Sequence, residues 1–151
     1  MITPQTTEIS SANLQSQMIA LVRAFGLHKP DTTPCGQPVS VAEAYALMEL
    51  ERAAPLSQNE LASRLVLEKS TVSRLVASLE QHGWISRIRS QHDARRVDLS
   101  LTAEGRRIQG QIAAARAAKF QRVLEAVPAS QREQVLAALN ILVEALHASS
   151  T

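Results

Sequence analysis

Apolar side chains recur every three or four positions along several stretches of the chain, a spacing that places them on one face of a helix. The first stretch begins near Ser10 and is expected to end at Gly26. A loop rich in proline follows over residues 28–38. A second helix is predicted over residues 41–53, where Ser40 can cap the free amides of the first turn. The first third of the chain is therefore predicted to be two helices joined by a loop.

Two shorter helices are predicted next, each with a recognisable start or end. Ser57 and Glu60 form the Ser-x-x-Glu pattern of a capping box, which marks the start of a short third helix. A fourth helix is expected over residues 69–82, because Gly83 provides a natural left-handed position just after it.

The spacing then changes from helical to alternating. Residues 85–90 and 97–101 are strand candidates, and the short segment between them predicts a hairpin. In the second strand the apolar residues fall on one face, while Asp98 and Ser100 fall on the other. We expect this hairpin to follow the fourth helix directly.

Two further helices complete the chain. Thr102 is the predicted cap of a long fifth helix, which Pro128 should terminate. Ser130 and Glu133 match a second capping box, which would start a sixth helix with an apolar stripe. The fold class predicted is mainly α with a small β-wing: about six helices, with the terminal helices forming a dimerisation lobe.

Positive charge is concentrated on the predicted helix and hairpin. Apolar residues make up 45% of the 151 positions, aromatic residues only 3%, and the formal net charge is +2. Residues 69–107 hold eight basic and four acidic residues, a net charge of +4, whereas the rest of the chain is net negative. A local phosphate-binding surface requires such a distribution.

The turn between the two strands is the most cationic part of the chain. Arg89, Arg95 and Arg96 gather there, where like charges repel one another and gain nothing from burial. Contact with DNA phosphates or the minor groove would explain this cluster; the alternative is a solvated loop with a chance cluster. Asp93 precedes Arg95 by two residues and can brace the turn or orient an arginine.

The fourth predicted helix has an apolar face for packing and a small polar face opposite. Small side chains allow close approach to base edges, and hydroxyl groups near the helix start can donate to phosphates or bases. Arg74 is the candidate for a bidentate guanine contact, or otherwise for a phosphate contact. The alternative is an ordinary amphipathic helix with a solvated face. The candidate DNA contacts on this helix are Ser70, Thr71, Ser73, Arg74 and Ser78.

Three segments carry a family resemblance. They are Lys69-Ser-Thr-Val-Ser-Arg-Leu-Val76, Leu79-Glu-Gln-His-Gly83-Trp-Ile-Ser-Arg87 and Asp93-Ala-Arg95-Arg96-Val-Asp-Leu-Ser-Leu-Thr102-Ala-Glu-Gly105. Together they resemble the multiple-antibiotic-resistance regulator (MarR) family of winged helix-turn-helix transcription factors. The third segment is similar to the wing of that family. The resemblance is strong over residues 57–105 and extends to the rest of the chain through the order of the helices.

The resemblance implies that the fourth helix contacts the major groove, that Arg95 at the wing tip reaches the minor groove, and that the terminal helices form a homodimer. It divides the single domain, residues 1–151, into a winged lobe over 40–101 and dimerisation helices over 9–27 and 102–147. Apolar faces on the terminal helices independently favour a dimer, because the small winged module cannot cover them all. In such a dimer, two copies of the fourth helix, here called the recognition helix, would lie about 34 Å apart and fit an inverted-repeat operator in double-stranded DNA. A repressor is the expected activity.

A small aromatic or phenolic effector, bound between the two lobes, is a further implication of the resemblance. Arg23, His28 and Tyr45 are the candidate ligand-binding residues, with Phe25 and Met48 as apolar neighbours. The alternative is that Tyr45 and Met48 belong to the core and that His28 is solvated.

Cys35 is the only cysteine of the sequence, so it has no internal disulfide partner. It lies in a loop just before a helix start, a setting in which a thiol can act as a peroxide sensor. Neither a secretory signal nor an apolar run of membrane length is present, which together with the single thiol predicts a cytoplasmic protein without a membrane span.

Two other functional classes fit the sequence less well. A winged-helix module that binds protein would more often carry apolar residues than arginines at its wing. An enzyme with Cys35 as nucleophile lacks a histidine or acid placed to form a dyad, and the chain has no Gly-rich phosphate loop. The histidines are scattered, so neither a metal site nor a cofactor is predicted.

Overall fold

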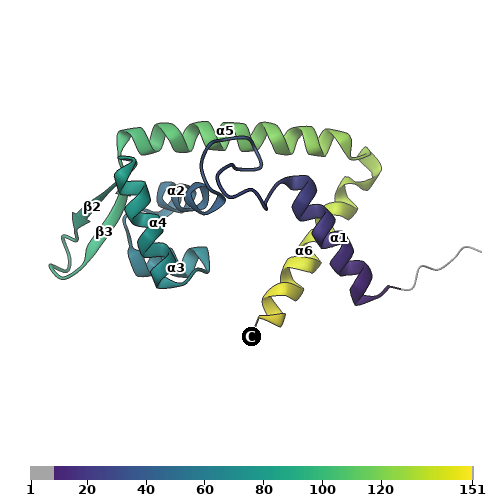
Figure 1. Ribbon diagram of the computed structural model, residues 1–151, viewed down its shortest axis with the longest axis horizontal. Helices are drawn as coiled ribbons and strands as arrows, with labels where there is room; N and C mark the ends of the chain where they lie inside the picture. Colours follow the sequence, from purple (N-terminus) through teal and green to yellow (C-terminus); the bar gives the residue numbers. More distant parts are fainter. Residues whose placement is uncertain (1–8, 151) are drawn as a thin grey trace, which may run out of the picture.

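The structure is a computed structural model that describes residues 9–150, in which six α-helices, three short strands and one 3₁₀ turn follow one another (Figure 1). This confirms the prediction of a mainly helical chain with a small β-wing. The elements are α1 (Ser11–Phe25), α2 (Val41–Ala53), β1 (Leu56–Ser57), α3 (Gln58–Leu65), α4 (Lys69–Gln81), β2 (Ile85–Arg89), β3 (Val97–Leu101), α5 (Ala103–Ala126), η1 (Ala129–Gln131) and α6 (Arg132–Ser149).

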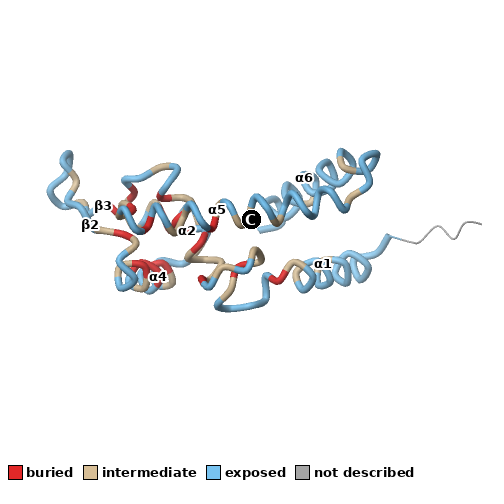
Figure 2. The backbone as a smooth tube through the Cα atoms, turned by 90° about the horizontal axis from the view of Figure 1, so that it is seen from above, coloured by how far each residue is buried: buried red, intermediate tan, exposed pale blue. Residues whose placement is uncertain are grey.

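The elements form two groups at opposite ends of α5. The first group, α2, α3, α4 and the strands, is here called the winged lobe, and α1 and α6 lie at the other end (Figure 1). Buried residues cluster in the winged lobe, whereas α1 and α6 are almost entirely exposed (Figure 2). Leu47, Leu61, Val76 and Leu99 are fully buried there, and Ile112 joins α5 to the same core.

The three strands form one antiparallel sheet in the order β1-β3-β2. β1 was not predicted: it has only two residues, and it exists because Ser57 pairs with Asp98 of β3. The predicted alternation holds for Leu99 and Leu101, which are buried, but it is wrong at the far end of β3. Val97, the first residue of β3, is 42% exposed because β3 extends beyond the core toward the wing. Asp98 is only 6% exposed, and its carboxylate accepts a hydrogen bond from the Arg96 guanidinium.

Side-chain caps fix most of the helix starts at the predicted residues. Ser10 accepts from the amide of Asn13, and Thr102 accepts from the amide of Gly105. Ser40 and Ser57 each form a complete capping box with the glutamate three residues on. The capping box predicted at Ser130 is wrong, because η1 intervenes and α6 begins at Arg132 without a side-chain cap.

The base of the wing is tied closely to the start of α5. The Thr102 hydroxyl donates to the Gly83 carbonyl at 2.7 Å, and the Thr102 amide donates to the Trp84 carbonyl at 3.0 Å. A Cβ at Gly105 would lie 1.9 Å from the Trp84 carbonyl oxygen, so only glycine allows α5 to lie this close to the backbone just before β2. The Leu-Thr-x-x-Gly sequence therefore builds a joint between wing and helix.

Large apolar side chains remain exposed on the terminal helices. Neither α1 nor α6 contains a buried residue, although both carry leucine, isoleucine or valine at helical spacing. Leu136, for example, is 59% exposed. Within residues 9–150, no helix combines the length and the hydrophobicity that crossing a membrane requires.

Candidate DNA-binding surface

Helix α4 presents a polar face to solvent, as predicted. Val72, Val76 and Leu79 are buried on its other face, against the core of the winged lobe. The helix starts after Glu68 without a side-chain cap, so its first backbone N–H groups have no side-chain partner. Such a helix start favours anions because its free amides and dipole are both positive. The hydroxyl-bearing residues of this first turn and the next are Ser70, Thr71 and Ser73, of which Thr71 is half-buried and the others are exposed.

Arg74 lies on the same exposed face, one turn into the helix. Its guanidinium forms no ion pair with any carboxylate of residues 9–150. An exposed guanidinium with no carboxylate partner keeps all of its donors available for a phosphate or a base edge.

Ser78 differs from the expectation that it shares this free polar face. It is half-buried, and its hydroxyl donates to Glu43 Oε1 of α2 at 2.8 Å. The Ser78 hydroxyl is therefore engaged within the protein. Sequence spacing could not show this, because Glu43 is 35 residues away along the chain.

The tip of the wing is exposed and carries two of the three predicted arginines. Arg89 and Arg95 are exposed, and neither forms an ion pair within the described part of the chain. Asp93 braces the turn, since its Oδ1 accepts from the Arg95 amide at 2.9 Å and its carbonyl accepts from the Arg96 amide at 3.0 Å. One of the two predicted roles of Asp93 is thus seen in the structure.

Arg96 points back into the winged lobe. Its Nε donates to Asp98 Oδ1 at 2.5 Å, and its Nη2 donates to Glu60 Oε2 at 2.6 Å. The hydrogen bonds that Arg96 donates to Asp98 and Glu60, in that order of effect, raise the pKa of its guanidinium. Arg96 is 38% exposed, in contrast to the free side chain predicted at the wing tip.

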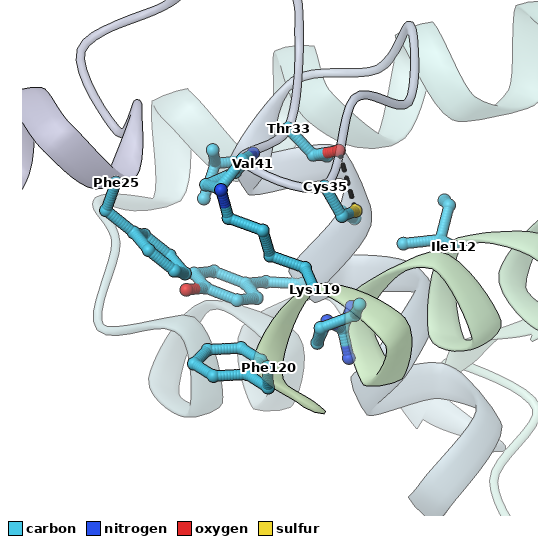
Figure 3. A pocket seen from close by; sticks show the side chains of 11 residues that line it. Phe25, Thr33, Cys35, Val41, Ile112, Lys119 and Phe120 are labelled. Carbon is cyan, nitrogen blue, oxygen red and sulfur yellow. Dashed lines mark hydrogen bonds between the residues drawn. The ribbon is translucent and has the colours of Figure 1, made fainter. Parts of the chain in front are cut away.

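A cavity lies where α1, α2, α5 and the loop before α2 meet. Figure 3 shows the side chains that line it. Its volume of about 70 Å³ is several times the roughly 10–15 Å³ that one water molecule requires. Its walls are mostly apolar, and within residues 9–150 no carboxylate lines it. The lining comprises Phe25, Thr33, Pro34, Cys35, Val41, Ala44, Tyr45, Ile112, Arg116, Lys119 and Phe120.

Of the three predicted ligand-binding residues, only Tyr45 lines this cavity. Arg23 and His28 lie together on a separate, open surface beside Met18, Ile19 and Val22. The structure therefore does not bring the three candidates together.

Cys35 reaches the same cavity as Tyr45. It is half-buried, and its Sγ lies 3.0 Å from Thr33 Oγ1 (Figure 3). The thiol thus borders an apolar space, with Ile112 across the cavity on α5.

Arg116 and Lys119 are cavity residues that the sequence analysis missed. The Lys119 Nζ lies 6.0 Å from the centroid of the Phe25 ring, and Arg116 Nη1 contacts Met48 Sδ at 3.1 Å. Their signal is the face of α5 on which Ile112 and Phe120 bracket the two cations at helical spacing. Helical spacing alone does not distinguish a basic residue that faces a cavity from one that faces solvent.

The helix-turn-helix of α3 and α4, the adjoining hairpin and the exposed arginines define a winged helix-turn-helix protein. A family model described as MarR family matches residues 37–96. The HTH-type transcriptional repressor MdtR of Bacillus subtilis is 31% identical over 115 residues, which span 76% of this chain and 72% of MdtR.

Solved structures match over nearly the whole chain. PcaV from Streptomyces coelicolor, in complex with its natural ligand, has a TM-score of 0.67 at 20% identity and covers 97% of this chain and 99% of its own. FabT from Streptococcus pneumoniae, in complex with DNA, has a TM-score of 0.71 at 21% identity, with coverage of 90% and 94%. The chain belongs to the MarR family and is a DNA-binding transcription regulator rather than an enzyme.

Proposed function

We propose that this regulator is a ligand-responsive repressor that acts in the cytoplasm and binds an inverted-repeat operator as a homodimer. The observation that carries the proposal is the pair of exposed cationic elements, the polar face of α4 with Arg74 and the wing tip with Arg95. The first has the shape of an element that enters the major groove, and the second has the shape and charge of one that follows the minor groove. MdtR is described as a repressor, and FabT was solved with DNA.

The terminal helices support the homodimer. The faces of α1 and α6 are apolar and exposed, and helices that carry such faces in a folded protein cover them with a partner surface. A second copy related by a two-fold axis would do so and would double the DNA-contacting surface.

Selection of bound sequences from a random pool of duplex DNA tests the core of this proposal. The expected result is an enriched inverted repeat whose half-sites are separated by about one helical turn, roughly 34 Å. A pool with no enriched sequence, or with single half-sites only, would contradict the proposed operator.

Arg74→Ala is expected to lower affinity for the selected operator by about 1–3 kcal/mol and to relax the preference at one base position of each half-site, if Arg74 contacts a base. Fluorescence anisotropy on the operator and its single-base variants measures both effects. If affinity falls equally for all sequences and the slope of log K against log salt decreases, Arg74 contacts a phosphate instead.

We further propose that the cavity between α2 and α5 takes the effector, an aromatic compound with a negative charge. The rings of Phe25, Tyr45 and Phe120 supply an apolar surface, while Arg116 and Lys119 supply the cations. A cavity with cations and without carboxylates favours an anionic ligand. PcaV is described with its natural ligand bound. The effector proposed for this chain rests on the residues that line its own cavity.

Benzoate is a suitable probe, because it is a single ring with one carboxylate. It is expected to raise the melting temperature of the wild type and to weaken operator binding. Arg116→Ala should need about tenfold more benzoate to reach the same two effects. Differential scanning fluorimetry and anisotropy measure the two effects, with uncharged benzyl alcohol as the matched ligand control. Equal responses of the two proteins would exclude Arg116 from the site.

Oxidant sensing through Cys35 is the second candidate for the signal, because the thiol borders the same cavity. The same assay decides it: peroxide should abolish operator binding in the wild type and spare Cys35→Ser. If both proteins respond alike, Cys35 serves as part of the cavity wall only.

A further inference from the structure

The glutamates of the two capping boxes each have a second partner outside their own helix. Glu43 is the third residue of α2 and Glu60 the third residue of α3. Each accepts a hydrogen bond from the backbone amide of its capping serine, which is the ordinary role of this position. In addition, Glu43 accepts from Ser78 of α4, and Glu60 accepts from Arg96 at the wing.

The Glu60 contact joins the wing to the start of α3. Glu60 Oε2 accepts from the Ser57 amide at 2.8 Å and from Arg96 Nη2 at 2.6 Å. The same guanidinium also donates to Asp98, whose strand pairs with β1 at Ser57. The amide of Ser57 and the guanidinium of Arg96, in that order, hold the pKa of Glu60 below its usual range, so the ion pair is intact at neutral pH.

The Glu43 contact joins α4, the proposed recognition helix, to the start of α2. Glu43 Oε2 accepts from the Ser40 amide at 2.9 Å, and Oε1 accepts from the Ser78 hydroxyl at 2.8 Å. Burial raises the pKa of Glu43, but the hydrogen bonds from Ser40 and Ser78 outweigh it and leave the pKa below its usual range. Both oxygens of this carboxylate are thus engaged, one by its own helix and one by α4.

We propose that Glu43 and Glu60 are positioning residues that hold the recognition helix and the wing in the orientation needed for DNA, through Ser78 and Arg96 respectively. The proposal rests on the proposed binding of an operator by α4 and the wing. It assigns Ser78 and Arg96, two of the residues first expected to contact DNA, to contacts within the protein. The exposed residues Arg74 and Arg95 remain as the groove contacts.

A stabilising role alone does not explain these contacts. Arg96 and Glu60 are 38% and 44% exposed, and ion pairs at such exposure add little to the free energy of folding. Their geometric effect is larger. Arg96 follows Arg95 directly, so fixing the guanidinium of Arg96 on Glu60 and Asp98 restricts the direction in which the backbone presents Arg95.

Glu60→Gln distinguishes a positioning role from a simple charge effect, because the two predict opposite changes in operator affinity. Glutamine is compatible with the capping box, so α3 keeps its start, while the charge opposite Arg96 is lost. Removal of an anion from a DNA-binding lobe should by itself strengthen binding to a polyanion. The positioning role predicts the opposite, a loss of operator affinity of about three- to tenfold.

Glu68→Gln is the matched control. Glu68 is exposed at the start of α4 and forms no ion pair within residues 9–150, so its neutralisation should leave affinity unchanged or raise it. The conservative variant Arg96→Lys should lose affinity as Glu60→Gln does. A lysine ammonium lacks the planar guanidinium that bonds Asp98 and Glu60 at the same time. Operator binding by Glu60→Gln that equals or exceeds that of the wild type overturns the proposal.

Amide hydrogen exchange of the DNA-free protein gives a second readout. The wing amides of Ser90 and Arg96, which donate within the turn, should exchange faster in Glu60→Gln while the amides of α5 do not change. Unchanged exchange at the wing overturns the role of Glu60. If the wild type selects no DNA, the proposed function fails, and the exchange result still decides whether Glu60 holds the wing.

Ser78→Ala tests the contact with the recognition helix without disturbing the cap of α2. It should lower operator affinity by about three- to tenfold, and Glu43→Gln added to it should cause little further loss, because the two residues act as one unit. If the two losses add, or if Glu43→Gln alone has no effect, Ser78 acts on DNA directly and the assignment of Glu43 is overturned.

Discussion

Replacing Arg95 with alanine is expected to weaken operator binding by about 1–3 kcal/mol per wing, roughly five- to 150-fold, and a dimer carries two wings. Arg95 is exposed at the tip of the hairpin, and its backbone amide is held by Asp93. The turn therefore presents the guanidinium outward without using it for folding. Because no carboxylate of the described residues neutralises it, the whole of its charge is available to a narrow, negative minor groove.

Gel-shift titration on the selected operator measures this loss, and Lys29→Ala is the matched control. Lys29 is also an exposed cation, but it lies in the loop before α2. Its removal changes the net charge by the same amount and should leave affinity within about twofold at moderate salt. Helical content and dimer mass should be the same in both variants. Equal affinity of Arg95→Ala and wild type would remove the wing tip from the mechanism.

Leu139→Arg is expected to dissociate the proposed dimer and to reduce operator affinity by about 10²–10⁴-fold. Leu139 lies in the apolar stripe of α6, where two-fold symmetry would bring both copies of the substitution into one interface. An unpaired cation buried there costs several kcal/mol. Loss of the dimer removes the high effective concentration with which the second half-site is bound, so each half-site is then bound independently.

Ile141→Arg is the control for this variant, because residue 141 projects from the opposite face of α6. Ile141 is 68% exposed, and the substitution adds the same charge to the same helix. Sedimentation analysis should show monomers for Leu139→Arg and dimers for Ile141→Arg. A dimeric Leu139→Arg protein with full affinity would show that copies associate through another surface.

Local signals predicted the helices and the hairpin well, because their ends depend on neighbouring residues. Ser40, Ser57 and Thr102 cap the helices that were predicted from them, and Ser10 caps the helix predicted to begin near it from apolar spacing. The errors occur where a distant partner decides the structure. Strand β1 has no alternation of its own and depends on β3, and Ser130 is not a cap because the chain forms a 3₁₀ turn there instead.

On the candidate DNA-binding surface, too, features set by neighbouring residues were predicted and features set by distant partners were not. Exposure of Arg74, Arg89 and Arg95 followed from helical spacing and from the turn, both of which are local. The inward orientation of Arg96 and Ser78 depends on glutamates 36 and 35 residues away, which a single sequence does not reveal.

The cavity was only partly predictable for a similar reason. Tyr45 lies on the second predicted helix, but the cations opposite it come from α5. The spacing of Ile112 and Phe120 places Arg116 on their face of α5 but does not show that this face meets α2. Contacts between elements far apart in the sequence set the chemistry of this cavity.

Helix α5 runs without interruption for 24 residues, with the wing joint at one end and the terminal helices at the other. At about 1.5 Å per residue it is a rod of roughly 36 Å. A tilt of only about 5° about the end next to the terminal helices would carry the wing end through roughly 3 Å, about the length of a hydrogen bond. The proposed effector, bound beside Phe120, would therefore not need to unfold any element to release the proposed operator, because a change in the angle of α5 alone would alter the fit to DNA.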